Sequence, residues 1–112
     1  MTFLTRLREN KAFAAYCDGY SSGSIACVTK AEAGIGDIIK TNDATIRLYM
    51  KFHKQPRNKR LKNNWIEGFK LGWIEFAAMY NSGDSKLWMN ESEYEVKHRL
   101  RDEWAKGRDV SD

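Results

Sequence analysis

The sequence predicts a mainly α-helical protein, in which about four helices pack as a compact bundle in a single domain spanning residues 1–112. The chain has 112 residues, a length that usually forms one domain. Its content of 42% hydrophobic and 12% aromatic residues is typical of a folded protein. It contains one proline, and apolar residues recur at helical spacing over most of its length.

The first helix is expected over residues 2–20, with Thr2 or Thr5 as its cap. Gly19 and Gly23 make helix costly, so we expect it to stop at residues 19–23. Residues 24–40 can be interpreted in two ways, as a short strand at residues 25–28 or as a weak helix over residues 30–39. The first helix is expected to be mainly apolar on one side, which would consist of Phe3, Leu4, Leu7, Phe13, Ala14, Cys17 and Tyr20.

A second helix is expected over residues 44–53, because Asn42 and Asp43 can accept the free N–H groups of a first turn. Pro56 then disfavours helix at the residue before it and marks a boundary. The strongest helical pattern covers residues 59–80 and predicts the central helix, which should end at Gly83. On this helix, Gly68 and Gly72 share the apolar side at a spacing that would let another helix approach closely.

A charged surface helix is expected over residues 91–106, with Asn90 and Glu93 forming its capping box. Its apolar stripe is narrow, consisting of Val96, Leu100 and Trp104. Three ion pairs are expected at i, i+4 spacing, namely Glu93 with Lys97, Glu95 with Arg99, and Asp102 with Lys106. Of the four tryptophans, Trp65 and Trp73 are expected in the core, whereas Trp88 and Trp104 are candidates for an interface.

The sequence favours a cytoplasmic address. No stretch approaches the roughly 18 apolar residues that a membrane-spanning helix needs, and no secretory signal is recognisable at the start. Cys17 and Cys27 form no metal or disulfide framework and are expected to be free thiols that act as small hydrophobic side chains.

Charge is concentrated in one part of the chain. The formal net charge of the chain is +4. The chain between Asp43 and Glu67 contains seven Lys and Arg residues and no acidic residue, so the rest of the chain is mildly acidic. This acid-free stretch, which we call the basic segment 47–62, is our candidate binding site. Its seven cations are Arg47, Lys51, Lys54, Arg57, Lys59, Arg60 and Lys62.

The basic segment has three interpretations, which are a solvated surface, a contact for nucleic acid or a ribonucleoprotein, and a contact for an acidic protein surface. Arg47, Lys51 and Lys54 would share one side of the second helix. The remaining cations enter the first turn of the central helix, where a phosphate would gain from free N–H groups. Tyr49, Phe52 and His53 could stack on unpaired bases, although we expect Tyr49 and Phe52 to face the core.

Little in the sequence indicates an enzyme. His53 and His98, the two histidines, lie on different predicted helices without the neighbours of a metal site. We therefore predict no catalytic residue, no metal and no cofactor.

Two stretches resemble the ribosome modulation factor family. They are residues 12–23, with Gly19-Tyr20-Ser21-Ser22-Gly23, and residues 60–69, with Arg60 followed by Trp65-Ile66-Glu67-Gly68-Phe69. The family consists of small basic two-helix proteins with a glycine turn after the first helix. The resemblance implies binding to ribosomal RNA or a ribosomal site, with Arg57 and Arg60 in matching positions.

The function expected from the sequence is non-enzymatic binding of nucleic acid or a ribonucleoprotein, with RNA or the ribosome favoured. The alternative is a phage-encoded or regulatory inhibitor that binds a host enzyme or defence complex through protein contacts. The two can be separated by the salt dependence of binding, which is steep when phosphates are contacted.

Overall fold

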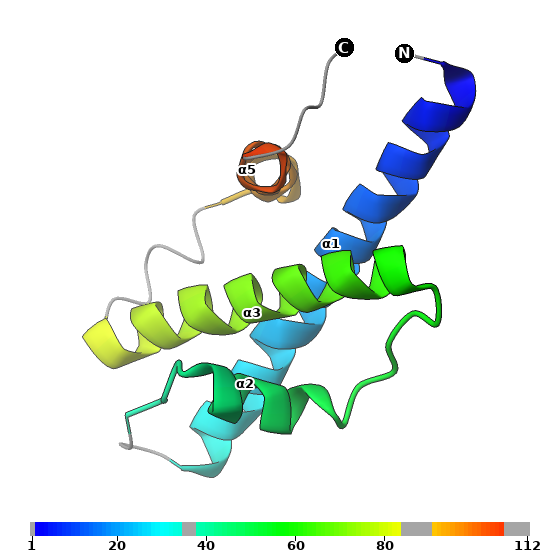
Figure 1. The fold of residues 1–112 in the computed structure, drawn as a ribbon. Coiled ribbons are helices and arrows are strands. Elements are labelled where there is room, and N and C mark those ends of the chain that lie inside the picture. The colour runs from blue at the N-terminus through cyan, green and yellow to red at the C-terminus, as the bar shows by residue number, and fades with distance from the viewer. Residues whose placement is uncertain (1, 35–37, 84–90, 107–112) are drawn as a thin grey trace.

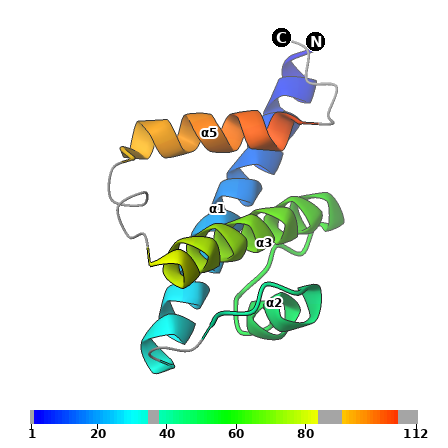
Figure 2. The same ribbon diagram turned by 90° about the vertical axis from the view of Figure 1, so that its left-hand side faces the viewer.

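A computed structural model describes residues 2–34, 38–83 and 91–106 of the chain. Four helices and no strand occur in these ranges, namely α1 (Phe3–Ala33), α2 (Asp43–Met50), α3 (Lys59–Ser82) and α5 (Glu93–Ala105). Helices α1 and α3 cross at the centre, with α2 packed on one side of the crossing and α5 on the other (Figures 1 and 2). The prediction of a mainly α-helical bundle is confirmed.

Helix α1 is longer than the sequence predicted. It begins at the expected cap, where the Thr2 hydroxyl accepts the N–H of Thr5, and runs for 31 residues to the Gly34 C-cap. At 1.5 Å per residue it is about 46 Å long, close to the longest extent of the molecule, 50 Å. The predicted stop at residues 19–23 and the glycine turn implied by the family resemblance are therefore wrong. Of the two interpretations of residues 24–40, the strand at residues 25–28 is wrong, and the helix over residues 30–39 holds only as far as Ala33.

The physical reason for the long helix is the crossing with α3. A Cβ atom at Gly19 or Gly23 would overlap the carbonyl groups of Trp65 or Phe69 on α3, and one at Gly68 would overlap the Tyr16 carbonyl on α1. The glycines of both helices thus let the two backbones touch, and tertiary packing outweighs their low helix propensity. The predicted close approach at Gly68 and Gly72 is confirmed.

Two hydrophobic clusters lie on the two sides of this crossing. The larger joins α1, α2 and α3 around Trp73 and Phe69, both fully buried. The smaller joins α1 to α5 and consists of Ala12, Phe13, Tyr16, Tyr20, Leu100 and Trp104. The narrow apolar stripe predicted for the last helix is confirmed, whereas Phe3, Leu4, Leu7 and Ala14 of α1 are exposed.

Hydrogen bonds fix the connection before α2. Ile39 exchanges two bonds with the Asn81 side chain on α3, at 2.9 and 3.0 Å, and the Trp73 indole donates to the Lys40 carbonyl at 2.9 Å. The Asn42 side chain then accepts the N–H of Thr45 at 2.8 Å and caps α2 as predicted. This tether holds the start of α2 against the core.

The ends of α3 and α5 show one agreement and one correction. Helix α3 ends at Ser82 with Gly83 as its C-cap, and the φ of 74° at Gly83 favours glycine, in agreement with the predicted stop. Helix α5 is capped by Ser92, whose hydroxyl accepts the N–H of Glu95 at 3.2 Å. The capping box predicted at Asn90 is wrong, because Ser92 and Glu95 satisfy the same pattern two residues later. Asn90 itself lies outside the described residues.

The side chains of α5 also pair differently than predicted. None of the three expected i, i+4 pairs is among the ion pairs of the described residues. Arg99 instead pairs with Glu75 of α3 and with Glu91, and Lys106 pairs with Glu103. Trp104 is 2% exposed and donates to Asn64 of α3 at 2.8 Å, so its assignment to an interface is wrong. Trp65 and Trp73 are buried as predicted, and Trp88 lies outside the described residues.

Candidate nucleic-acid interface

The basic segment 47–62 runs from the end of α2, through the connection that contains Pro56, into the first turn of α3 (Figure 1). All seven of its Lys and Arg side chains are exposed. The connection contributes Lys51, Lys54 and Arg57, and α3 contributes Lys59, Arg60 and Lys62. The structure therefore presents the cations of the segment to solvent.

Helix α2 ends earlier than predicted, at Met50 rather than near His53. The N–H groups of Phe52 and His53 donate to the carbonyls of Tyr49 and Met50 in a tighter turn, and the Gln55 side chain also donates to the Met50 carbonyl at 3.3 Å. Lys54 therefore lies outside the helix. The predicted alignment of Arg47, Lys51 and Lys54 on one side of a helix is wrong for Lys54.

Arg47 differs from the other cations because it has a carboxylate partner. Its guanidinium lies 2.7 Å from Asp43, one turn earlier in α2, and the Lys70 ammonium lies 2.7 Å from the same carboxylate. Hydrogen bonds from Lys70 and then Arg47 lower the pKa of Asp43. Arg47 is thus partly neutralised, and the free positive charge of the segment begins at Lys51.

Phe52 is the aromatic residue that the segment exposes. Tyr49 stacks on Trp73 with ring centroids 4.9 Å apart, and His53 packs its ring against Phe69 at 5.4 Å. Phe52, between Lys51 and His53, is 80% exposed. The prediction that Tyr49 faces the core is confirmed, but the same prediction for Phe52 is wrong, because the tight turn after Met50 directs it outward.

The first turn of α3 is not an open phosphate site. The Asn58 side chain accepts the N–H groups of Arg60 and Leu61 at 3.0 and 3.1 Å, and its carbonyl accepts that of Lys62. The hypothesis of a phosphate held by free N–H groups is therefore wrong for these amides. The side chains of Lys59, Arg60 and Lys62 remain exposed at this turn.

The structure adds residues of α1 that sequence reasoning missed. The Arg60 guanidinium donates to the Arg8 carbonyl at 3.1 Å, which brings the start of α1 beside the start of α3. Arg8 and Lys11 line a hollow of about 600 Å³ together with Thr5, Glu9, Asn58, Arg60 and Leu61. Only the parallel glycine spacings at residues 19 and 23 and at residues 68 and 72 could have indicated that these two helix starts meet.

Other classes of site have little basis in the described structure. No group of three or more His, Cys, Asp or Glu side chains within residues 2–34, 38–83 and 91–106 could hold a metal ion. Cys17 and Cys27 are free thiols, as expected. None of the helices in the same ranges is long and apolar enough to cross a membrane.

Comparison of the chain with protein-family models, with curated proteins and with solved structures finds no match. The assignment of a function consequently rests on the geometry of this chain alone.

Proposed function

We propose that the protein binds single-stranded RNA, free or exposed on a ribonucleoprotein, through Phe52 and the free cations of the basic segment 47–62. The observation that carries the proposal is Phe52, a large aromatic ring that is 80% exposed between unpaired cations. Proteins that bind single strands combine aromatic rings, on which bases stack, with cations that follow the backbone.

The charges around Phe52 support an anionic partner. Lys51, Lys54, Arg57, Lys59 and Lys62 form no ion pair with the carboxylates of the described residues, and no acidic residue interrupts the segment. Arg8 and Lys11 add two cations on α1, where Glu9 lines the same hollow. Together these cations could therefore contact about five phosphates of an RNA strand and release the counterions condensed on them.

Fluorescence anisotropy with a labelled RNA of about 12 nucleotides would test the proposal. We expect the logarithm of the association constant to fall with the logarithm of salt concentration with a slope of about −3 to −4. Replacing Lys54 and Arg57 with Gln should reduce the steepness of this slope by about 1.4. Phe52→Ala should weaken binding about five- to a hundredfold at every salt concentration and leave the slope unchanged.

Two matched variants serve as controls. Leu48→Ala removes an exposed apolar side chain of α2, and Lys106→Gln removes an exposed cation at the C-cap of α5. Neither should change RNA binding. Absence of binding at low salt, or equal losses in Phe52→Ala and Leu48→Ala, would contradict the proposal.

The alternative, an inhibitor that docks on an acidic protein surface, predicts a different result in a pull-down from lysate. A partner retained after nuclease treatment, and lost when Lys54 and Arg57 are replaced, would favour protein binding. A partner released by nuclease would favour the RNA proposal.

A further inference from the structure

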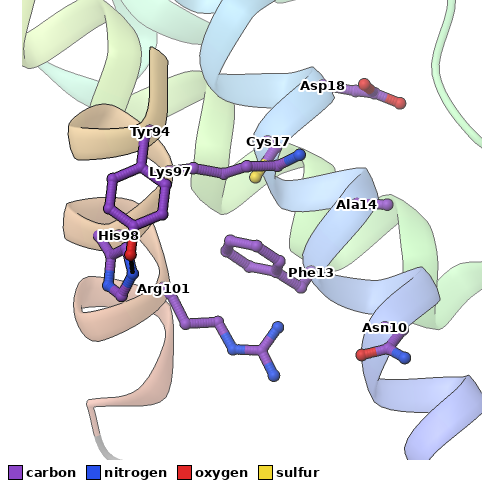
Figure 3. A pocket seen from close by; sticks show the side chains of 9 residues that line it. All are labelled: Asn10, Phe13, Ala14, Cys17, Asp18, Tyr94, Lys97, His98 and Arg101. Atoms are coloured by element: carbon purple, nitrogen blue, oxygen red, sulfur yellow. Dashed lines mark hydrogen bonds between the residues drawn. The ribbon is translucent and has the colours of Figure 1, made fainter. Parts of the chain in front are cut away.

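A groove between α1 and α5 lies apart from the basic segment and shares no residue with it. It has a volume of about 580 Å³, within the range of small-molecule sites. Asn10, Phe13, Ala14, Cys17 and Asp18 line it from α1, and Tyr94, Lys97, His98 and Arg101 line it from α5 (Figure 3).

The surface contributed by α1 is mainly apolar. Phe13, which is 8% exposed, contributes a small part of its ring, Ala14 contributes a methyl group, and Cys17 contributes its sulfur. Burial raises the pKa of the Cys17 thiol, an effect that the charge of Lys97 partly offsets. The thiol is therefore uncharged at neutral pH and extends the apolar surface. Such a surface suits a planar hydrocarbon or aromatic body.

The surface contributed by α5 is cationic. Lys97 and Arg101, one turn apart, reach from α5 toward α1, and neither forms an ion pair with a carboxylate of the described residues (Figure 3). The Arg101 guanidinium lies over the Phe13 ring, 4.9 Å from its centroid, and 5.8 Å from that of Trp104. These rings hold the charged group at the edge of the apolar surface.

The acidic residues of α5 do not line this groove. Glu91, which precedes α5, and Glu75 of α3 pair with Arg99 on another side of the helix and do not line the groove either. Asp18 is the one acidic residue among the described residues that line the groove, and Figure 3 shows it pointing away from Lys97 and Arg101. The groove is thus polarised, with an apolar surface on one wall and two cations without carboxylate partners on the other.

We propose that the groove between α1 and α5 binds a small organic anion, whose planar apolar body packs on Phe13 and Ala14 while its carboxylate or phosphate contacts Lys97 and Arg101. The Asn10 amide and the hydrogen-bonded pair of Tyr94 and His98, with a distance of 2.8 Å between Tyr94 Oη and His98 Nε2, form the polar rim. Charge complementarity sets the sign of the ligand, and the apolar wall sets its shape.

Titration of the full chain with three naphthalene probes, followed by NMR of labelled protein, tests this proposal. The probes are 1-naphthoate, 1-naphthyl phosphate and the neutral 1-naphthalenemethanol. We expect both anions to shift the side-chain amide signals of Asn10 and to bind about tenfold more tightly than the neutral probe. The ratio of the two anion affinities tells whether carboxylates or phosphates are preferred.

Substitutions separate the charge from the shape. Lys97→Met should weaken the binding of both anions about five- to tenfold and leave the affinity of the neutral probe unchanged. Lys106→Met, at the C-cap of the same helix and outside the groove, should change none of the three affinities. Ala14→Leu should weaken all three probes by filling the groove. Equal affinity of anionic and neutral probes, signal shifts confined to other surfaces, or anion binding that is insensitive to Lys97→Met would overturn the proposal.

Discussion

At the scale of single residues, Ser24 carries a polar group that the fold leaves unsatisfied. It is 4% exposed at the crossing of α1 and α3, and its hydroxyl has no hydrogen-bond partner among the described residues. A Cβ atom built on Gly72 would lie 2.9 Å from this hydroxyl, so the packing around it is tight. Burying an unsatisfied hydroxyl costs about 1–3 kcal/mol.

Ser24→Ala is therefore expected to raise the free energy of unfolding by about 1 kcal/mol or more, measured by urea denaturation. It removes the buried hydroxyl and keeps the Cβ atom. The control is Ser21→Ala, at an exposed position of the same helix, which should yield only the helix-propensity gain of about 0.5 kcal/mol. A Ser24→Ala protein no more stable than Ser21→Ala would show that the hydroxyl is satisfied in solution.

Residue-level predictions from the sequence succeeded where one helix determines the outcome and failed where a turn intervenes. Tyr49 lies inside α2, and helical spacing correctly places it against Trp73. Phe52 lies beyond the end of α2, where spacing no longer determines direction. The extra cations Arg8 and Lys11 depend on a contact between distant parts of the chain, which no local pattern records.

At the scale of the elements, four glycines determine how α1 and α3 pack. Gly19 and Gly23 on α1, and Gly68 and Gly72 on α3, are buried at matching spacing, and each faces backbone of the other helix. The sequence pattern predicted the close approach from α3 alone. It failed for α1 because a glycine pair reads as a helix stop unless its partner helix is known.

Gly68→Ala is expected to lower the free energy of unfolding by about 1–3 kcal/mol, because the new methyl group would overlap the Tyr16 carbonyl. Helix propensity alone would raise the free energy of unfolding by up to about 1 kcal/mol, so the sign of the change is diagnostic. As a control, Ala78→Gly at an exposed position of α3 should cost about 1 kcal/mol through propensity only. Stabilisation by Gly68→Ala, seen in thermal or urea unfolding, would refute the close crossing.

At the scale of the whole molecule, α5 is fastened to the crossing by one small cluster and one polar network. Arg99 donates to Glu75 at 2.7 and 2.8 Å, to Glu91 at 2.9 and 3.1 Å, and to the Tyr20 hydroxyl at 3.1 Å. Tyr20 in turn donates to Glu75 at 2.7 Å. These bonds join α1, α3 and α5 through a single guanidinium. The carboxylates of Glu91 and Glu75 raise the pKa of this guanidinium above its ordinary value.

Arg99→Met should therefore loosen α5 selectively and lower the free energy of unfolding by about 1–2 kcal/mol, a range that allows for the partial exposure of the network. Native-state hydrogen exchange should show faster exchange in α5 and little change in α3. Lys106→Met, which removes an exposed pair on the same helix, should have little effect on exchange or stability. Uniform acceleration across all helices would mean that α5 does not open separately.

The parallel crossing of α1 and α3 also has a consequence for how the chain folds. Its central contacts join residues near 19 to residues near 68, with the whole of α2 in the loop between them. This loop must close before the crossing forms, and closure is entropically unfavourable. Helical proteins usually fold rapidly because most of their contacts are local. We expect this chain to fold more slowly than a bundle of sequential antiparallel helices of equal length, with α1 acquiring its full length only once α3 has docked.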